Sequence, residues 1–144
     1  MSDDRYVKAA LAVAREVVGS RPAEVRLSTP ENRADARIDV LPANPSACGV
    51  SIFPMGHQID LLLGPDGVLH ELWQKRHEER LHNLRRCLTA VITGGYEERW
   101  HQKRLPWPHT QLVGTFHTEQ GDIVFKHQGG EPEGLELERR YEPY

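Results

Sequence analysis

The stretch from residue 48 to residue 95 constrains the fold more than any other part of the chain, because its apolar residues change their spacing midway. In the first half they alternate with their neighbours along three short runs, 50–54, 59–63 and 68–73. A spacing of two is the period of a β-strand with one buried face. In the second half the apolar residues stand three and four apart: Leu81, Leu84, Leu88 and Val91. This is the period of an amphipathic helix, so the stretch predicts three strands followed by one long helix.

Turn residues mark the ends of these elements. Gly64-Pro65-Asp66-Gly67 combines a proline that presets φ with residues that tolerate left-handed geometry, which predicts a tight turn and an antiparallel meander. Gly94-Gly95 suits a left-handed cap at the end of the helix. The helix face opposite the apolar stripe is polar: Lys75, Arg76, Glu78, Glu79, Arg80, Asn83, Arg85 and Arg86. We therefore expect the helix to lie across one sheet face, with these polar side chains in water.

The rest of the chain adds one helix and several strands. Ser2 is a candidate cap for a helix with an Ala-rich apolar stripe that ends at Gly19. Alternating patterns predict strands at 23–28 and 34–41 before the central stretch, a weakly alternating segment at 96–104 after it, and a hairpin formed by 111–117 and 122–127. The segment 129–144 is either a further edge strand over 135–139 or a partly disordered tail.

The order of these elements predicts an α+β fold, because runs of strands interrupted by one helix favour an antiparallel sheet. We expect about six to eight strands, covered by an N-terminal helix and one long central helix. The 144 residues contain no internal repeat and no linker-like segment, which predicts a single domain over 1–144.

Composition excludes several classes of function. The net charge of -3 gives no overall field that would recruit nucleic acid or an anionic membrane. No apolar run approaches the roughly 20 residues that span a bilayer, and the first charged residues, Asp3 and Asp4, are acidic where a signal peptide would begin with basic ones. We therefore expect a cytoplasmic protein without a membrane partner. Two isolated cysteines, Cys48 and Cys87, are then expected to be reduced core residues.

Eight histidines raise the question of a metal site, but their spacing does not supply one. His77 and His82 lie five residues apart, so their rings point about 140° apart around a helix and cannot share an ion. The sequence also lacks the Gly-x-Ser-x-Gly motif of hydrolases and a phosphate-binding glycine loop. Glu97 and Glu98 are adjacent in a strand and point to opposite faces. We predict no catalytic residue, no metal and no cofactor.

The most distinctive local feature is the segment Arg99 to His109, which interleaves basic and aromatic residues without an acid. Tryptophan and arginine dominate protein-binding hot spots, which makes five residues candidates for partner binding: Arg99, Trp100, Lys103, Arg104 and Trp107. The same composition can bind single-stranded nucleic acid by stacking, and both tryptophans can equally be core anchors. The acidity of the whole chain and the shortness of the segment favour protein binding over nucleic acid.

The stretch LTAVITGGYEERW, residues 88–100, and the order of elements resemble small bacterial immunity proteins, which bind and block a cognate toxin. This resemblance implies a non-enzymatic binding protein whose partner is a toxin, and an acidic tail (Glu131, Glu133, Glu136 and Glu138) could meet a basic surface on it. Two alternatives stay open. One is a small-ligand or metal-dependent enzyme with a site assembled from His57, Asp60, His70 and His117. The other is a nucleic-acid accessory protein that uses Trp100 and Trp107.

Overall fold

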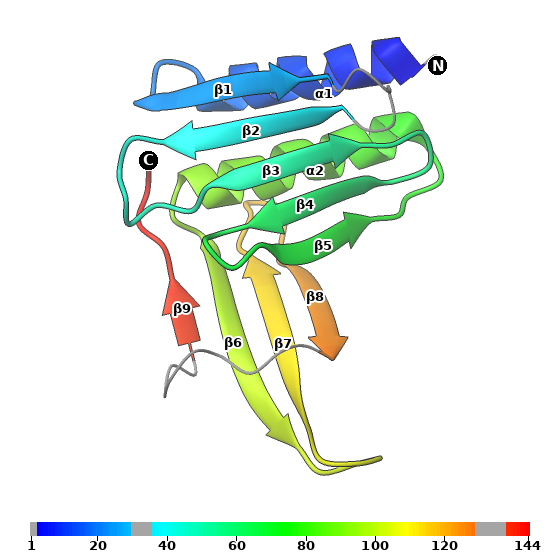
Figure 1. Cartoon of the computed structure of the whole chain (residues 1–144), viewed down its shortest axis with the longest axis vertical. Helices are drawn as coiled ribbons and strands as arrows, with labels where there is room; N and C mark the ends of the chain where they lie inside the picture. The colour runs from blue at the N-terminus through cyan, green and yellow to red at the C-terminus, as the bar shows by residue number, and fades with distance from the viewer. Residues whose placement is uncertain (1–2, 30–35, 129–137) are drawn as a thin grey trace.

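The computed structural model describes residues 3–29, 36–128 and 138–144, which form an α+β fold with two helices and two antiparallel sheets (Figure 1). The helices are α1 (Asp3–Val18) and α2 (His77–Ile92). The first sheet has the order β1-β2-β3-β4-β5, with strands Ala23–Ser28, Arg37–Pro42, Val50–Pro54, Ile59–Leu63 and Val68–Leu72. The second has the order β8-β7-β6-β9, with β6 Tyr96–Lys103, β7 His109–Phe116, β8 Ile123–Gln128 and β9 Glu138–Arg140.

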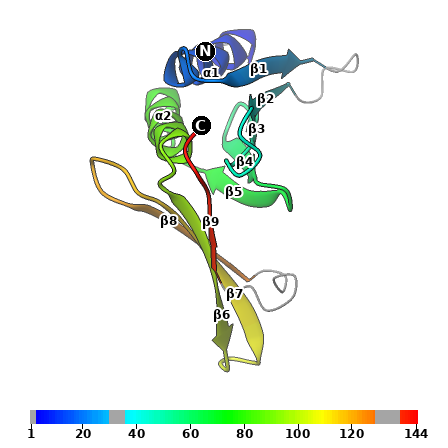
Figure 2. The same cartoon turned by 90° about the vertical axis from the view of Figure 1, so that its left-hand side faces the viewer.

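The main core lies between the two helices and one face of the first sheet (Figure 2). Alternate residues of β2, β3 and β4 point into it, and α2 contributes its apolar stripe. Among the largest side chains in the core that are fully buried are Tyr6, Ile38, Ile52, Ile59, Leu61, Leu63, Leu84 and Leu88. Burial of this apolar surface is the dominant stabilising term of such a domain.

The second sheet begins where α2 ends. Gly94 takes a φ of 77°, and the chain then enters β6, whose strand direction crosses that of the first sheet (Figure 1). β6 pairs with β7 along its whole length, from Tyr96 opposite Phe116 to Lys103 opposite His109. The far end of this hairpin projects beyond the rest of the molecule (Figure 1).

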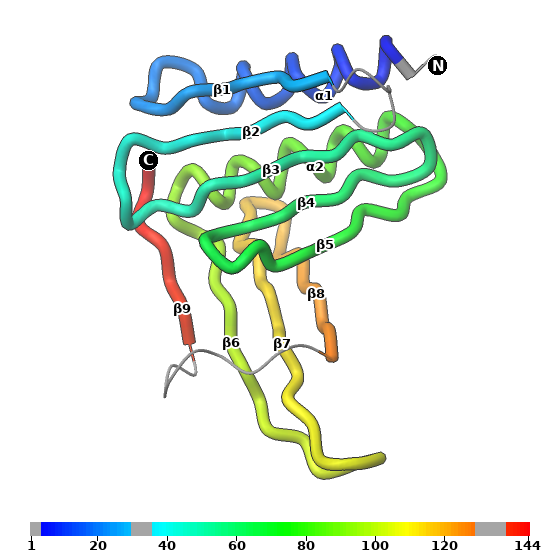
Figure 3. Tube along the Cα trace, in the orientation of Figure 1, coloured from blue at the N-terminus to red at the C-terminus, as the bar shows by residue number. Residues whose placement is uncertain are grey.

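The C-terminal residues return to the junction of the two sheets (Figure 3). β9 pairs antiparallel with β6, where Glu97 stands opposite Arg140. The following residues reach the first sheet: Glu142 forms a parallel bridge with Ala47, and the hydroxyl of Tyr144 donates to the carbonyl of Cys48 at 2.6 Å. The amide of Tyr144 donates to the carbonyl of Ile92 at the end of α2. This segment therefore connects both sheets and a helix.

The predicted α+β class, the antiparallel pairing, the N-terminal helix and the central helix are confirmed. The described residues differ from the prediction in forming nine strands in two sheets rather than six to eight in one. The reason is α2, which carries the chain across the first sheet before β6 begins. Cys48 and Cys87 are buried and unpaired, as predicted. Residues 129–137 of the predicted tail and the predicted cap Ser2 lie outside the described residues.

The prediction that the polar face of α2 is solvated is wrong for Arg80, which is buried. Its guanidinium donates to the Tyr6 hydroxyl at 2.8 Å and to three backbone carbonyls, those of Gly56, His57 and Gln74, at 2.8 to 3.0 Å. A buried charge persists only when hydrogen bonds replace its hydration. Arg80 therefore connects α2 to α1 and to the loops at the ends of β3 and β5.

Candidate functional site

The projecting β6–β7 hairpin carries most of the predicted partner-binding residues at its far end. Leu105 and Trp107 lie in the connecting loop with 84% and 55% of their surface exposed. Lys103 and Arg104 are exposed beside them. The loop also contains a cis peptide bond, between Leu105 and Pro106. The tip of this arm, residues 103–107, therefore presents two large apolar side chains next to two cations.

The structure separates the other two predicted binding residues from this tip. Trp100 is only 8% exposed, and the guanidinium of Arg139 lies over its ring at 5.7 Å. Arg99 is exposed and pairs with Glu97 and Glu138 at the base of the arm. Trp100 is thus buried beneath a side chain of β9, whereas Trp107 faces water.

The four residues of the enzyme alternative do not converge. His70 is fully buried, and Asp60 accepts a hydrogen bond from Gln58 at 2.7 Å. His117 contacts Glu97 and Asp122, while His57 is exposed. Among the interactions of the described residues, none joins any two of His57, Asp60, His70 and His117. The described part of the chain also contains no group of three His, Cys, Asp or Glu side chains that could hold a metal ion.

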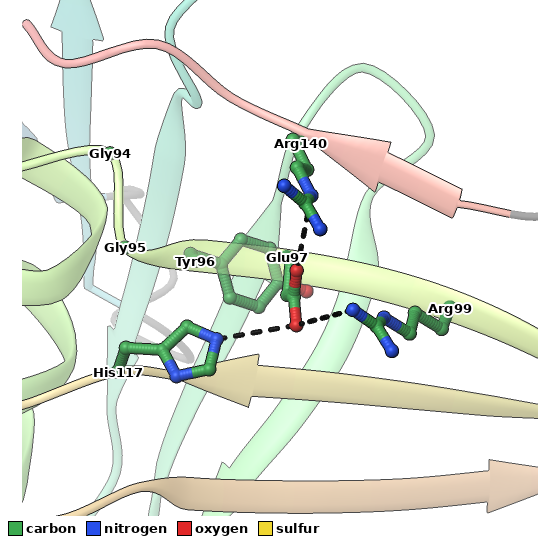
Figure 4. Close-up of a pocket in the computed structure, with 7 residues that line it drawn as sticks. All are labelled: Gly94, Gly95, Tyr96, Glu97, Arg99, His117 and Arg140. Atoms are coloured by element: carbon green, nitrogen blue, oxygen red, sulfur yellow. Dashed lines mark hydrogen bonds and ion pairs between the residues drawn. The ribbon is translucent and has the colours of Figure 1, made fainter.

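An open pocket of about 370 Å³ lies at the base of the arm, beside the end of α2 (Figure 4). It is lined by Gly94, Gly95, Tyr96, Glu97, Arg99, His117 and Arg140. Figure 4 shows three cationic side chains around the Glu97 carboxylate: His117 Nε2 at 3.2 Å, Arg140 Nε at 3.4 Å and Arg99 Nη2 at 3.5 Å.

The charges around this pocket are matched. Arg140 and Arg99 also pair with Glu138, and His117 Nδ1 lies 3.0 Å from Asp122. Hydrogen bonds to Glu97 and Asp122 raise the pKa of His117. Three carboxylates therefore face three cationic groups when His117 is protonated, so the charges that the described residues place here balance one another. We assign this pocket the role of fixing β6, β7 and β9 at the base of the arm.

A second polar cluster is buried between the two sheets. His70, on β5 of the first sheet, places its Nδ1 2.7 Å from His127 Nε2 and its Nε2 2.9 Å from the Tyr96 hydroxyl. The Tyr96 hydroxyl donates to Glu98 Oε2 at 2.7 Å. These four residues, His127, His70, Tyr96 and Glu98, form a continuous hydrogen-bonded series that we call the buried polar chain. His127 is partly exposed, whereas Tyr96 is 1% exposed and both His70 and Glu98 are fully buried.

Residues from the C-terminal segment complete the surroundings of Glu98. The hydroxyl of Tyr141 donates to Glu98 Oε1 at 3.2 Å. Arg139 Nη1 lies 4.0 Å from the same oxygen and 2.7 Å from Asp66 Oδ2 in the β4–β5 turn. The buried carboxylate therefore joins β6 and β9 directly, and the β4–β5 turn through Arg139.

Burial shifts the pKa values of His70 and Glu98, two members of this chain, toward the value that favours the neutral form. Desolvation lowers the pKa of His70 to about 3, and the neighbouring His127 adds to the effect. Desolvation raises the pKa of Glu98, although hydrogen bonds from Tyr96 and Tyr141 and the charge of Arg139 oppose it. A neutral His70 and a Glu98 that readily binds a proton follow from the same cause.

The sequence contains a signal for this cluster that our predictions did not use. In β5, strand alternation places His70 on the same face as Val68 and Leu72, which is the inward face. In β6, Glu98 lies between Tyr96 and Trp100 on the buried face, an acid where an apolar residue is expected. The prediction that Glu97 and Glu98 point to opposite faces is confirmed, since Glu97 lines the open pocket and Glu98 is buried.

Neither of the two helices in the described residues is long and apolar enough to cross a membrane. Comparison of the chain with models of protein families, with curated proteins and with solved structures finds no match.

Proposed function

We propose that this chain is a non-enzymatic protein-binding module that docks on its partner through the tip of the β6–β7 arm. The observation that carries the proposal is the exposure of Leu105 and Trp107 together at the end of a projecting hairpin. Two large apolar side chains in water are unfavourable, and their removal from water on binding would be worth several kcal/mol by area, roughly 25 cal/mol per Å². Tryptophan is among the residues most enriched in binding hot spots.

The charge of the tip favours a partner with an acidic rim. Lys103 and Arg104 flank the apolar pair, and within the described residues no ion pair involves either of them. Long basic side chains at the edge of an interface steer an acidic partner and fix its orientation. The partner surface that fits the tip is therefore an apolar pocket surrounded by carboxylates.

The finer proposal is that the partner is a bacterial toxin, bound in the cytoplasm, which the chain inhibits. It is supported by the resemblance of residues 88–100 to small bacterial immunity proteins. The same residues run from the end of α2 into the arm, so the resemblance covers the root of the docking element. A narrow hairpin can also enter a concave site, which is one place where an enzyme inhibitor can act. The predicted acidic tail contributes Glu138 to the described residues, where it pairs with Arg140 in β9.

Site-specific photo-crosslinking in the source organism tests the docking surface. A photoreactive phenylalanine analogue replaces Trp107 in one variant and Trp73 in a matched control. Trp73 follows β5 and is 66% exposed, so it is at least as accessible but lies in the loop before α2. The expected result is one protein adduct that forms from position 107 and not from position 73.

The adduct partner is then purified and its affinity for the chain measured by calorimetry. Leu105→Ser with Trp107→Ser should weaken binding by about tenfold or more, and Trp73→Ser should leave it unchanged. The charge reversal Arg104→Glu should weaken binding most at low salt. Equal adducts from both positions, or affinity that survives the double substitution, would overturn the proposal. A nucleic-acid adduct at position 107 would replace it with the stacking function.

A further inference from the structure

The buried polar chain joins a partly exposed histidine to a fully buried carboxylate through groups that can each both accept and donate a proton. We propose that His127, His70 and Tyr96 form a proton path from the surface to Glu98. Glu98 then binds or releases a proton when the direction of every hydrogen bond along the path reverses, and the two sheets need not separate. The path is independent of the β6–β7 tip and of the proposed docking function.

When Glu98 is ionised, every hydrogen bond in the chain points toward it. Tyr96 has one hydroxyl proton and donates it to Glu98 Oε2, so its oxygen accepts a proton from His70 Nε2. A neutral His70 then has a bare Nδ1, which accepts the proton of His127 Nε2. The hydrogen-bond network thus fixes the tautomer of His70 with its proton on Nε2.

When Glu98 is protonated, every bond points the other way. A proton enters at Nδ1 of His127, and the proton on His127 Nε2 passes to His70 Nδ1. The proton on His70 Nε2 passes to the Tyr96 oxygen, and the Tyr96 hydroxyl proton passes to Glu98 Oε2. One proton has been added in total, both nitrogens of His70 and the Tyr96 oxygen keep their partners, and His70 ends neutral with its proton on Nδ1.

The geometry suits such a transfer. All three donor–acceptor distances are between 2.7 and 2.9 Å, which is within the range of well-formed hydrogen bonds. The His70 ring is held in place, since Phe125 stacks on it at 4.7 Å and the nearly parallel His127 ring lies beside its edge, with centroids 4.9 Å apart. His70 therefore changes tautomer in place, without a change of rotamer.

The groups that face Glu98 determine how strongly it binds the proton. From β6 it meets the Tyr96 hydroxyl, and from the C-terminal segment the Tyr141 hydroxyl and the Arg139 guanidinium. From the β4–β5 turn it feels the charge of Asp66, and from the segment before β3 the Cys48 thiol interacts with it electrostatically. Among the described residues, Arg139 is the cation that faces Glu98. Its Nη1 lies 2.7 Å from the Asp66 carboxylate and 4.0 Å from that of Glu98. Glu98 can thus lose its charge while Arg139 keeps a carboxylate partner.

Solution NMR on the full-length protein of 144 residues tests the proton path. The carboxyl ¹³C signal of Glu98 and the ring ¹⁵N signals of His70 are followed between pH 4 and pH 8. We expect the Glu98 signal to titrate at a midpoint above the ordinary glutamate value. At the same midpoint the protonated nitrogen of His70 should change from Nε2 to Nδ1, while the ring stays neutral.

Three conservative variants separate the path from a static packing role. Tyr96→Phe removes the link, so Glu98 should titrate while His70 keeps one tautomer throughout. His127→Phe keeps an aromatic ring at this position but removes the acceptor for His70 Nδ1, so the Glu98 midpoint should fall. Tyr144→Phe is the matched control, because its hydroxyl is also partly buried near Cys48 but lies outside the chain; it should leave both signals unchanged.

Each opposite result would overturn the proposal. One is a His70 tautomer that stays fixed in the wild-type protein while Glu98 titrates. Another is coupled titration that persists in Tyr96→Phe. If Tyr96→Phe does not fold, the Glu98 midpoint in His127→Phe tests the proposal instead. An unchanged midpoint in that variant would also overturn the proposed path.

Discussion

The contact between His70 and Gly114 shows how closely the two sheets meet. A Cβ atom at position 114 would lie 2.3 Å from Nε2 of His70 and 2.5 Å from its Cε1. Real Cβ atoms do not approach other heavy atoms so closely, and the buried, stacked imidazole has nowhere to move. Only glycine at position 114 therefore leaves room for the His70 ring to reach Tyr96.

Gly114→Ala should destabilise the protein by about 1–3 kcal/mol, because one methyl group overpacks the sheet junction. Urea unfolding followed by circular dichroism measures the change. Gly49→Ala is the control, since a Cβ there would make ordinary contacts at 3.6 and 3.8 Å and should change stability far less. Equal losses in the two variants would contradict the predicted contact.

His70 should make the free energy of unfolding depend on pH. Burial lowers its pKa from 6.5 to about 3, so between these values the unfolded chain binds a proton that the folded protein does not. Above pH 6.5 His70 is neutral in both states and does not lower the free energy of unfolding. As the pH falls below 6.5, the free energy of unfolding decreases by up to about 1.4 kcal/mol per pH unit. Glu98 acts in the opposite direction, because its raised pKa makes stability fall as the pH rises.

Urea unfolding at pH 7, 6 and 5 for the wild-type protein and for His70→Gln isolates the histidine. The comparison uses the slope of the free energy against pH, so a general loss of stability in the variant does not affect it. As the pH decreases, the free energy of unfolding should fall more steeply for the wild-type protein than for His70→Gln. Equal slopes would show that His70 takes up its proton normally in the folded state.

The two tryptophans of the β6–β7 arm have different roles although they are seven positions apart in one hairpin. Trp100→Ala should destabilise the protein by about 3 kcal/mol, since the ring is buried and packs under Arg139. Trp107→Ala should change stability by no more than about 0.5 kcal/mol, since its ring faces water. Thermal unfolding measures both, and each variant serves as the control for the other. A larger loss for Trp107 would mean that the tip is folded against the body.

Individual elements were predictable because each carries its own pattern. The strand periods of β3 and β4, the turn at 64–67 and the helix stripe of α2 depend only on neighbours in the sequence. The exposure of Trp107 and the burial of Trp100 were not, because no local pattern shows which part of the arm a distant strand will cover. What separates them is the return of β9 to β6, a long-range contact that covers the base of the arm and leaves its tip bare.

At the scale of the whole molecule, the sequence predicts the type and order of the elements better than their grouping into sheets. The split into two sheets depends on the path of α2, and the burial of Arg80 depends on three carbonyls from two loops. The buried polar chain likewise draws on β5, β6 and β8. Sites assembled from several distant elements can be recognised in the sequence only by a polar residue at a position that the strand or helix period places on the buried face.

The pairing of β9 with β6 has a consequence for the order of folding. The strands of the first sheet pair with their neighbours in the sequence, whereas β9 must find β6 across the intervening β7 and β8. Long-range pairing closes a large loop and is entropically expensive, so it forms late on the folding path. Tyr141→Phe should therefore speed unfolding with little effect on the folding rate, whereas Ile52→Val in β3 should slow folding. Stopped-flow kinetics in urea distinguish the two, and a slower folding rate for Tyr141→Phe would place β9 in the folding nucleus.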